Sequence, residues 1–303
     1  MFLKVSLFGV IFNWTVVFAN QQITTNKHSF GILTAYQAFG DAIHSTIVLL
    51  FVCPMIYLNN EVLLSHSHYA GYWLLFGYEL STQSHFLISC NRFCAVFYPL
   101  KYSSVFSISN TYRLASFMIV LSLVTTFVDF YIGCPLTWFK EVFLFNFPQS
   151  TICSIAAFYT DFCKYLLFIT LVVIIDILTV FRVHQLRKRV HSTTAASDKR
   201  AAAQKAREMS FLKQTCAQGV IFTCELITYF ILSPTITHQW VLFFCTSFAW
   251  VAVHSLDGCV TLIFNQDMRK FIKKSILRKR NPEDSSRLSN LDMTSKNSST
   301  KPF

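Results

Sequence analysis

The sequence contains little glycine, little proline and little charge. Among its 303 residues, 8 are glycine and 7 are proline, and only 14% are charged. This scarcity of glycine and proline excludes collagen-like and low-complexity chains. A soluble core would not need 53% hydrophobic residues, and so few charged groups would not keep such a chain dissolved. The composition therefore indicates an integral membrane protein.

The sequence also lacks the short motifs of common enzyme classes. It contains no nucleophile elbow, phosphate-binding loop, dinucleotide fingerprint or zinc-binding helix motif. Cys90 and Cys94 have no nearby histidine that would suggest zinc, and the pair His66 and His68 is better explained as ordinary surface groups than as an outer metal site with His238. We therefore expect no enzyme, no cofactor and no bound metal.

Long apolar segments, rich in phenylalanine, recur along the chain. A helix needs about 20 apolar residues to cross the hydrocarbon core of a bilayer. The segments show no alternating pattern, which favours helices over a membrane barrel, and no internal repeat suggests an inverted-repeat transporter. The sequence predicts an all-α membrane protein, a seven-transmembrane helix bundle with spans at 1–19, 32–58, 70–97, 113–133, 159–182, 211–233 and 240–264.

The basic residues gather on one side of these spans. The net charge is +11, and most of it lies in the 182–213 loop and the 269–301 tail, whereas the opposite side keeps little beyond Lys4, Lys140 and Lys164. Because basic residues are enriched in cytosolic segments, the amino end is predicted outside and the tail in the cytosol. The bilayer explains this charge, so we expect no nucleic-acid partner.

Residues 1–19 allow a second interpretation. Lys4, the apolar run and the small residue Ala19 also fit a signal peptide. Cleavage would turn the basic 182–213 loop outward, against the charge rule, so we interpret the segment as a true span. This span starts at Met1, and we expect either almost no outer tail or a chain whose amino end is incomplete.

The carboxyl-terminal part is predicted to leave the membrane core. In residues 265–280, apolar side chains recur at helical spacing among lysines and arginines. This pattern predicts an amphipathic basic helix on the inner leaflet of the lipid bilayer, with a solvated basic run as the alternative. Residues 281–303 are polar and serine-rich, and predict a disordered cytosolic tail.

Glu79 and Glu225 are acidic residues within predicted spans, where the bilayer makes polar groups costly. Counted along their helices, the two carboxyls lie at a similar depth from the inner face. Together they are candidates for a ligand or proton site. The alternative, slightly favoured, is that hydroxyls such as those of Thr82, Thr223 or Thr228 satisfy each carboxyl separately.

The segment 91–102 closes the third span with an arginine and a Pro-Leu-Lys-Tyr loop. An arginine costs little where an apolar helix meets the cytosolic interface. Arg92, Pro99, Leu100 and Tyr102 fall at a spacing that resembles the Asp-Arg-Tyr region of rhodopsin-like receptors, in which the arginine meets the G protein. Asn91 takes the usual aspartate position, so a resting-state lock would need another partner, for which Glu208 is the candidate. The alternative is that Arg92 extends to lipid phosphate.

The same resemblance concerns three polar residues near the middle of their spans. It implies that Asn13, Asp41 and Asp257 form an intramembrane polar network that rearranges on activation, with Asp257-Gly258 standing where Asn-Pro is usual. Simple hydrogen bonding between helices is the alternative. The seventh span has no lysine, which excludes a retinal Schiff base.

Five of the ten cysteines lie toward the predicted oxidising exterior, so a disulfide is expected among them. Rhodopsin-like receptors usually pair a cysteine at the top of the third span with the long outer loop, but residues 65–72 contain none. Cys134 with Cys153 is the first choice and Cys53 with either is the second.

A closer resemblance covers nearly the whole chain. The segments that carry it are 29–33, 91–102, 133–135 with Trp138, 160–162, 214–219, 229–230, 249–258 and 262–265. With these segments the chain resembles the nematode serpentine chemoreceptors of class X. The resemblance implies an orphan chemosensory G-protein-coupled receptor in the plasma membrane, at the cilium of sensory neurons, with an external small molecule or peptide as ligand. The alternatives are a transporter or channel, or a non-signalling partner of another receptor.

Overall fold

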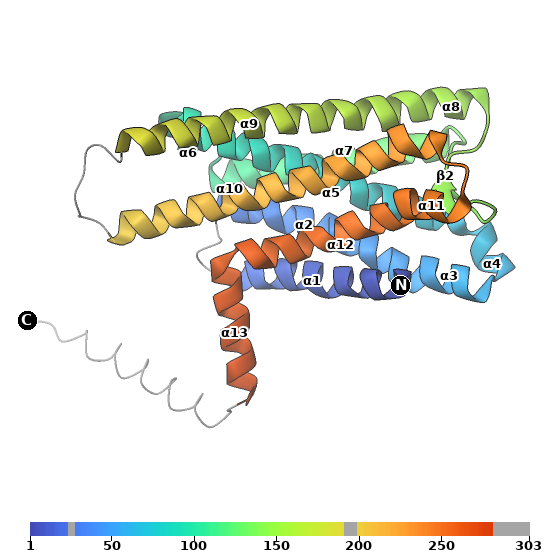
Figure 1. Ribbon diagram of the computed structural model, residues 1–303, viewed down its shortest axis with the longest axis horizontal. Coiled ribbons are helices and arrows are strands. Elements are labelled where there is room, and N and C mark those ends of the chain that lie inside the picture. The colour runs from blue at the N-terminus through green and yellow to red at the C-terminus, as the bar shows by residue number, and fades with distance from the viewer. Residues whose placement is uncertain (24–27, 191–198, 281–303) are drawn as a thin grey trace, which may run out of the picture.

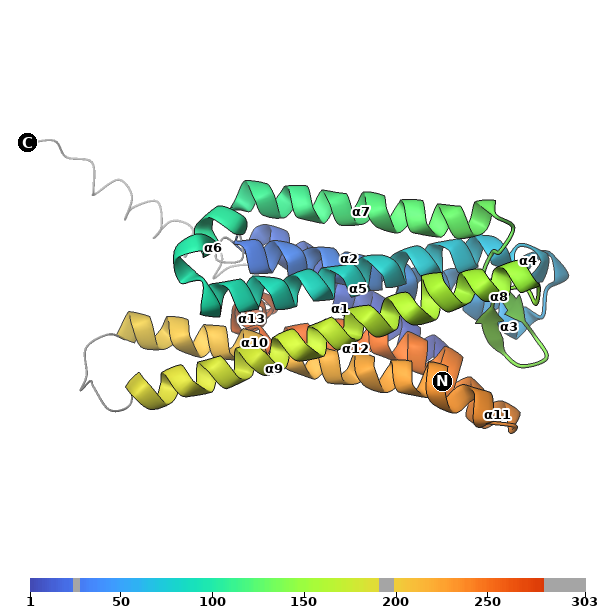
Figure 2. The ribbon, with the colours of Figure 1, turned by 90° about the horizontal axis from the view of Figure 1, so that it is seen from above.

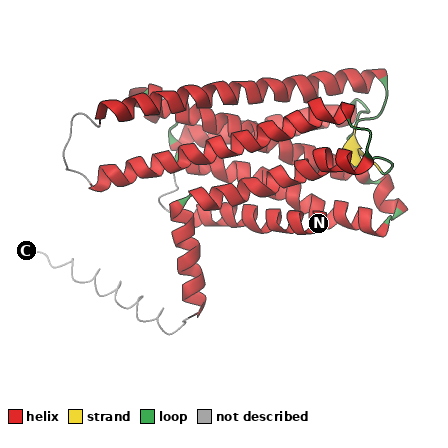
Figure 3. Ribbon diagram, viewed as in Figure 1, coloured by secondary structure: helices red, strands yellow, loops and turns green. Residues whose placement is uncertain are grey.

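The computed structural model describes residues 1–23, 28–190 and 199–280. This part of the chain forms a bundle of long helices with a small two-stranded hairpin (Figure 3). The predicted all-α bundle is therefore confirmed. We call the end with the hairpin the outer end, and the opposite end, where α13 (Gln266–Arg280) leaves the bundle, the inner end (Figure 1). These names follow the predicted orientation, which stays a prediction.

The first half of the chain supplies three long helical units and the short helices that join them. Its elements are α1 (Phe2–Gln22), α2 (Ser29–Ile47), α3 (Cys53–Leu58), α4 (Glu61–Ser65), α5 (Ser67–Phe97), α6 (Pro99–Val105) and α7 (Ile108–Tyr131). A π-helical turn, Val48–Val52, joins α2 to α3. It precedes Pro54, whose ring would collide with the carbonyl of Leu50 in a regular α-helix, so the wider turn lets the span continue.

The second half contains the hairpin and the remaining long helices. Its elements are β1 (Thr137–Phe139), β2 (Leu144–Asn146), α8 (Thr151–Ala157), α9 (Lys164–Val190), α10 (Lys199–Leu226), α11 (Gln239–Phe243), α12 (Ala249–Phe264) and α13. The π-helical segments Phe158–Cys163, Ile227–Leu232 and Phe244–Phe248 lie in or beside these helices near the outer end, and Ser233–Thr235 is a short 3-10 turn.

Six helical units in the described ranges are long and apolar enough to cross a membrane: Phe2–Gln22, Ser29–Leu58, Ile108–Tyr131, Thr151–Leu186, Met209–Thr235 and Gln239–Phe264. The seventh, α5, has 31 residues but buries a polar stretch that includes Glu79, Gln83 and Asn91. It packs against α2, α7 and α9 and runs through the middle of the bundle (Figure 2). Its polar side chains therefore meet other helices rather than lipid, which explains its lower hydropathy.

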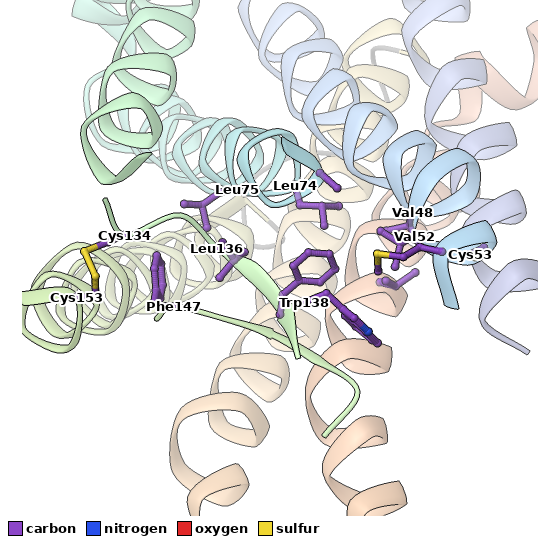
Figure 4. Close-up of a cluster of buried hydrophobic side chains, with 14 residues drawn as sticks. Val48, Val52, Cys53, Leu74, Leu75, Cys134, Leu136, Trp138, Phe147 and Cys153 are labelled. Carbon is purple, nitrogen blue, oxygen red and sulfur yellow. A yellow bond between two sulfur atoms is a disulfide. The ribbon is translucent and has the colours of Figure 1, made fainter. Parts of the chain in front are cut away.

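The hairpin lies over the outer end of the bundle. Its strands pair antiparallel with Trp138 opposite Phe145, and a disulfide joins Cys134 to Cys153, the pair favoured first from the sequence. Leu136 packs beside Leu75 of α5 (Figure 4). Gly71 makes this approach possible, because a Cβ there would lie 1.9 Å from the carbonyl oxygen of Leu136.

Helix α13 turns away from the bundle at the inner end, roughly perpendicular to the long helices (Figure 1). Asn265 begins it by accepting hydrogen bonds from the backbone amides of Asp267 and Met268, both at 3.1 Å. Met268 is fully buried in a cluster with Val16 and Val17 of α1. The predicted 265–280 segment is thus helical, while its contact with lipid stays a prediction. The predicted tail, 281–303, lies outside the described residues.

Candidate functional site

A small cavity of about 30 Å³ lies beneath the hairpin at the outer end. Its wall is drawn from α5, the hairpin, the π-helical segments beside α9 and α10, the end of α10, and α12. The lining residues are Leu75, Tyr78, Leu136, Phe145, Asp161, Glu225, Tyr229, Phe230 and Trp250. The wall is therefore mostly aromatic and carries two carboxyl groups, a combination typical of small-molecule sites.

Glu225 contributes one of the two carboxyl groups of this wall. Its side chain is 96% buried, and its Oε2 accepts a hydrogen bond from the Tyr78 hydroxyl at 3.3 Å. Within the described ranges no donor bonds its other oxygen, Oε1, and none bonds the carboxyl of Asp161. The two acidic groups thus retain hydrogen-bonding capacity on the cavity side, because an ionised carboxylate can accept at both oxygens.

Glu79 lies beside this cavity but does not line it. Its carboxylate forms an ion pair with Lys164 and accepts hydrogen bonds from the Tyr165 hydroxyl at 2.9 Å and from Gln83 at 3.0 Å. The two predicted carboxyls therefore have different surroundings, with Glu225 facing the cavity and Glu79 bound to neighbouring side chains.

The predicted threonine partners are wrong for both carboxyls. The hydroxyls of Thr82 and Thr223 donate to the carbonyls of Tyr78 and Gly219, four residues earlier, and Thr228 donates to the backbone carbonyl of Glu225. A threonine within a helix usually finds such a carbonyl, which leaves its hydroxyl unavailable to a carboxylate on a neighbouring helix.

Sequence reasoning missed Asp161 and Lys164 as members of this site. Lys164 was counted only as an outer positive charge, and Asp161 only within the segment that carries the family resemblance. The sequence did offer one indication that the two residues act together, because residues three apart lie on one face of a helix. Lys164 reaches Glu79 on α5, and its charge also acts on Asp129 and Asp161.

Tyr78 connects the cavity to the middle of the bundle. Its hydroxyl bonds Glu225, and its ring lies edge-on to those of Tyr165 at 4.5 Å, His254 at 5.4 Å and Trp250 at 5.8 Å between centroids. Packed aromatic contacts of this kind are geometrically specific. Tyr78 therefore contacts both Glu225 and His254, so a displacement of Glu225 that moves Tyr78 would also change the packing of His254.

The predicted polar residues Asn13, Asp41 and Asp257 gather around α12. Asp41 contacts the Nδ1 atom of His254 at 2.7 Å, and Asn13 donates to the backbone carbonyl of the same histidine at 2.8 Å. Gln37 donates to the carboxylate of Asp257 at 3.0 Å. Asn13 and Asp41 thus both contact His254, whereas Asp257, on the same helix, has its own partner in Gln37. A network that rearranges among the three stays a prediction.

His254 and Gln218 complete this cluster but were not singled out from the sequence. Gln218, on α10, donates to the backbone carbonyl of Asp257 and to the hydroxyl of Thr261, both at 3.3 Å. The ring of His44 lies 4.0 Å from that of His254 between centroids, tilted by 34°. Their signal was that each is a polar residue inside a predicted span, which the bilayer makes costly.

Arg92 lies at the inner end of α5 and is 91% buried. Its guanidinium stands 3.6 Å from the ring centre of Phe30 on α2 and 4.8 Å from that of Phe211 on α10. Such contacts are attractive because the ring face is electron-rich. The alternative in which Arg92 extends to lipid phosphate is therefore wrong, because aromatic rings of two other helices cover the side chain. The side chain of Glu208, its suggested partner, lies outside the described residues.

The residues around Arg92 join three elements of the inner end. Asn91 donates to the hydroxyl oxygen of Ser29 at 3.0 Å, and the hydroxyls of Ser29 and Tyr102 are 2.6 Å apart. These bonds connect α5, α2 and α6. Pro99 begins α6, and Leu100 beside it is 95% exposed. Hydrogen bonds thus hold Tyr102 against α5 and α2, while the apolar side chain of Leu100 faces away from the bundle.

Comparisons with known proteins match most of the chain. A family model described as the serpentine type 7TM GPCR chemoreceptor Srx matches residues 3–265. Serpentine receptor class X 45 of Caenorhabditis elegans is 26% identical over 282 residues, which cover 88% of this chain and 78% of that protein. Serpentine receptor class X-43 of the same organism is 28% identical over 271 residues, which cover 88% of this chain and 83% of that protein.

Proposed function

Because the chain belongs to the Srx family of serpentine seven-transmembrane chemoreceptors, and so to a class of multi-pass membrane receptors rather than enzymes, we propose a specific mode of signalling for it. An external ligand binds in the cavity beneath the hairpin, and a heterotrimeric G protein binds at the inner end. The chemosensory role of the family makes the plasma membrane of sensory neurons, at the cilium, the proposed place of action.

The observation that carries this proposal is that α10 touches both ends of the molecule. Near its outer end it presents Glu225 to the cavity, and near its inner end Phe211 covers Arg92. The two residues are 14 positions apart (225 − 211), which is about 21 Å along a helix. Between them Gln218 contacts the polar cluster. A ligand that moves α10 at Glu225 would therefore also move Phe211.

This movement gives Arg92 its proposed role. In the structure the guanidinium is covered by Phe30 and Phe211, so a partner protein has little access to it. A ligand that binds more tightly to the state in which α10 has shifted will increase the population of that state. The exposed guanidinium, together with Leu100 beside it, then offers a charged and apolar surface to the G protein.

Replacing Arg92 by alanine is expected to abolish the ligand response without changing the amount of receptor at the cell surface. The measurement is intracellular calcium in cells that express the chain with a promiscuous G protein, exposed to a panel of odorants and peptides. Arg113→Ala is the matched control, because Arg113 is an exposed arginine at the inner end of α7 that donates to the side-chain oxygen of its neighbour Asn110. Equal loss in both variants, or a ligand-gated current without any G protein, would contradict the proposal.

Replacing Phe211 by alanine is expected to raise signalling in the absence of ligand. The substitution removes one of the two rings that cover Arg92, and a contact of this kind contributes about 0.5–2 kcal/mol. Losing about 1.4 kcal/mol of resting-state stabilisation would raise the active population about tenfold. Basal calcium or G-protein turnover at equal surface level measures the change, and Phe117→Ala, at an exposed position of α7, is the control. An unchanged basal level in Phe211→Ala would exclude the cover as a resting-state restraint.

A further inference from the structure

The acidic groups at the outer end outnumber the cations available to them. Glu79, Asp129, Asp161 and Glu225 lie near one another, and within the described ranges Lys164 is the cation whose charge acts on Asp129 and Asp161. Lys164 already forms its ion pair with Glu79. Within the described ranges, neither of the two carboxyls that line the cavity forms an ion pair of its own, and Asp161 shares the charge of Lys164 with Glu79 and Asp129, which is costly for buried acidic groups.

Glu225 is the side chain that points most directly to a missing partner. It is 96% buried, it lines the cavity, and one of its oxygens accepts no hydrogen bond within the described ranges. Because this oxygen faces the cavity and no protein donor uses it, it can accept a hydrogen bond from a donor that enters from outside. Asp161 faces the same space from the opposite helix.

The rest of the wall is aromatic. Tyr229, Phe230 and Trp250 join Tyr78 and Phe145 around the two carboxyls. Aromatic faces attract ammonium groups, and tryptophan does so best. An anionic ligand would meet two carboxyls on the wall of the cavity, and a neutral apolar ligand would leave the oxygen of Glu225 without a donor. The cavity volume of about 30 Å³ is far below that of drug-sized ligand sites, so it admits a compact charged group rather than a large molecule.

From this geometry we infer that the ligand is a small organic cation, with its ammonium group held between Asp161 and Glu225 and its apolar part against Tyr229, Phe230 and Trp250. This inference rests on the proposed function for its signalling role, because the cavity is the proposed ligand site. An ammonium donor at Glu225 would also compete with the Tyr78 hydroxyl for the carboxylate. The ligand charge would thus act on the residue that connects the cavity to His254.

Binding is tested on the full purified chain in lipid nanodiscs, without a G protein. The probes are phenyltrimethylammonium, 2-phenylethylammonium and a series of straight-chain alkylammonium ions, each compared with a neutral molecule of the same shape, such as 2-phenylethanol. Ligands that bind the folded state raise its melting temperature. We expect cations of the series to raise the melting temperature while their neutral counterparts do not. If no cation stabilises the protein more than its neutral counterpart, the inference is overturned.

Two conservative substitutions assign the effect to this cavity. Glu225→Gln and Asp161→Asn keep the side-chain shape and remove one charge each, and each is expected to weaken cation affinity about tenfold or more. Glu61→Gln removes an equivalent charge from the exposed surface of α4 and is expected to leave affinity unchanged. If a neutralised variant does not fold, Glu225→Asp replaces it, because moving the carboxylate should reorder the preference for cation size. Cation binding that is unaffected by all of these cavity changes would overturn the inference.

Failure of this inference and failure of the proposed function give different results. Cation binding without any G-protein response would leave the ligand class standing and exclude the signalling role. A G-protein response that depends on Arg92 but is triggered only by neutral or anionic molecules would leave the receptor role standing and exclude the cation.

Discussion

Replacing Lys164 by methionine is expected to unfold much of the outer end of the receptor. The lysine pairs with Glu79, which is 99% buried and has no room to reach water, and its charge also acts on Asp129 and Asp161. Among the residues that the structure describes, methionine would remove the cation whose charge acts on this group of carboxyls. Removing one partner of a buried ion pair typically costs about 3–5 kcal/mol, and like-charge repulsion would add to that loss. Thermal unfolding of the purified protein measures the effect.

The matched variant Glu79→Gln is expected to be milder. It removes a negative charge, and Lys164 would still have Asp129 and Asp161 nearby. Tyr165 and Gln83 can still bond the glutamine side chain. The double variant Glu79→Gln/Lys164→Met should recover part of the stability lost by Lys164→Met alone, since the uncompensated charge of Glu79 is gone. If Glu79→Gln destabilises the protein more than Lys164→Met, the stability contributed by Lys164 does not come from neutralising the surrounding carboxyl groups.

The sequence was sufficient to predict the helical bundle, because long apolar runs without alternation leave few other structures in a bilayer. It also predicted a helix over residues 265–280, and it favoured the Cys134–Cys153 pair that the structure joins. Asn13, Asp41 and Asp257 were singled out together as a network, and that network stays a prediction, although Asn13 and Asp41 both contact His254 on the helix that carries Asp257. The predicted helices and the predicted disulfide depend on where a residue lies along the chain.

The rotation of each helix about its own axis could not be read from one sequence. Glu79 and Glu225 were placed at a similar depth, yet Glu79 faces Lys164 while Glu225 faces the cavity. Rotation is set by the packing of neighbouring helices, which involves residues far apart in the chain. The cover of Arg92 by Phe30 and Phe211 is of the same kind, because these rings come from two other helices. The depth of a residue in the bundle can be predicted by counting along its helix, whereas the side chains that it contacts depend on how the helices pack.

The close packing of α2 against α5 depends on two glycines that face each other. A Cβ added at Gly40 would lie 2.7 Å from the carbonyl oxygen of Gly77 and 3.0 Å from the backbone nitrogen of Ser81, and a Cβ at Gly77 would lie 2.7 Å from the carbonyl oxygen of Gly40. Small residues allow membrane helices to approach in this way. Since the obstructing atoms belong to the backbone, a side chain at either position must push the helices apart.

Gly40→Leu is therefore expected to prevent the receptor from folding, and Gly40→Ala to destabilise it by about 1–3 kcal/mol through overpacking. Alanine in a helix is intrinsically more favourable than glycine by about 0.5–1 kcal/mol, so a lower stability of Gly40→Ala would show that the backbone contact outweighs this preference. Gly219→Ala is the matched control: its added Cβ would lie 3.5 Å from the nearest atom, Nε2 of His85, an ordinary contact. Surface level and melting temperature should fall for Gly40→Ala and hold or rise for Gly219→Ala. If both alanine variants keep the surface level and melting temperature of the parent protein, the close backbone contact between α2 and α5 does not stabilise the bundle. The position of α5 in the middle of the bundle would then depend on its polar side chains.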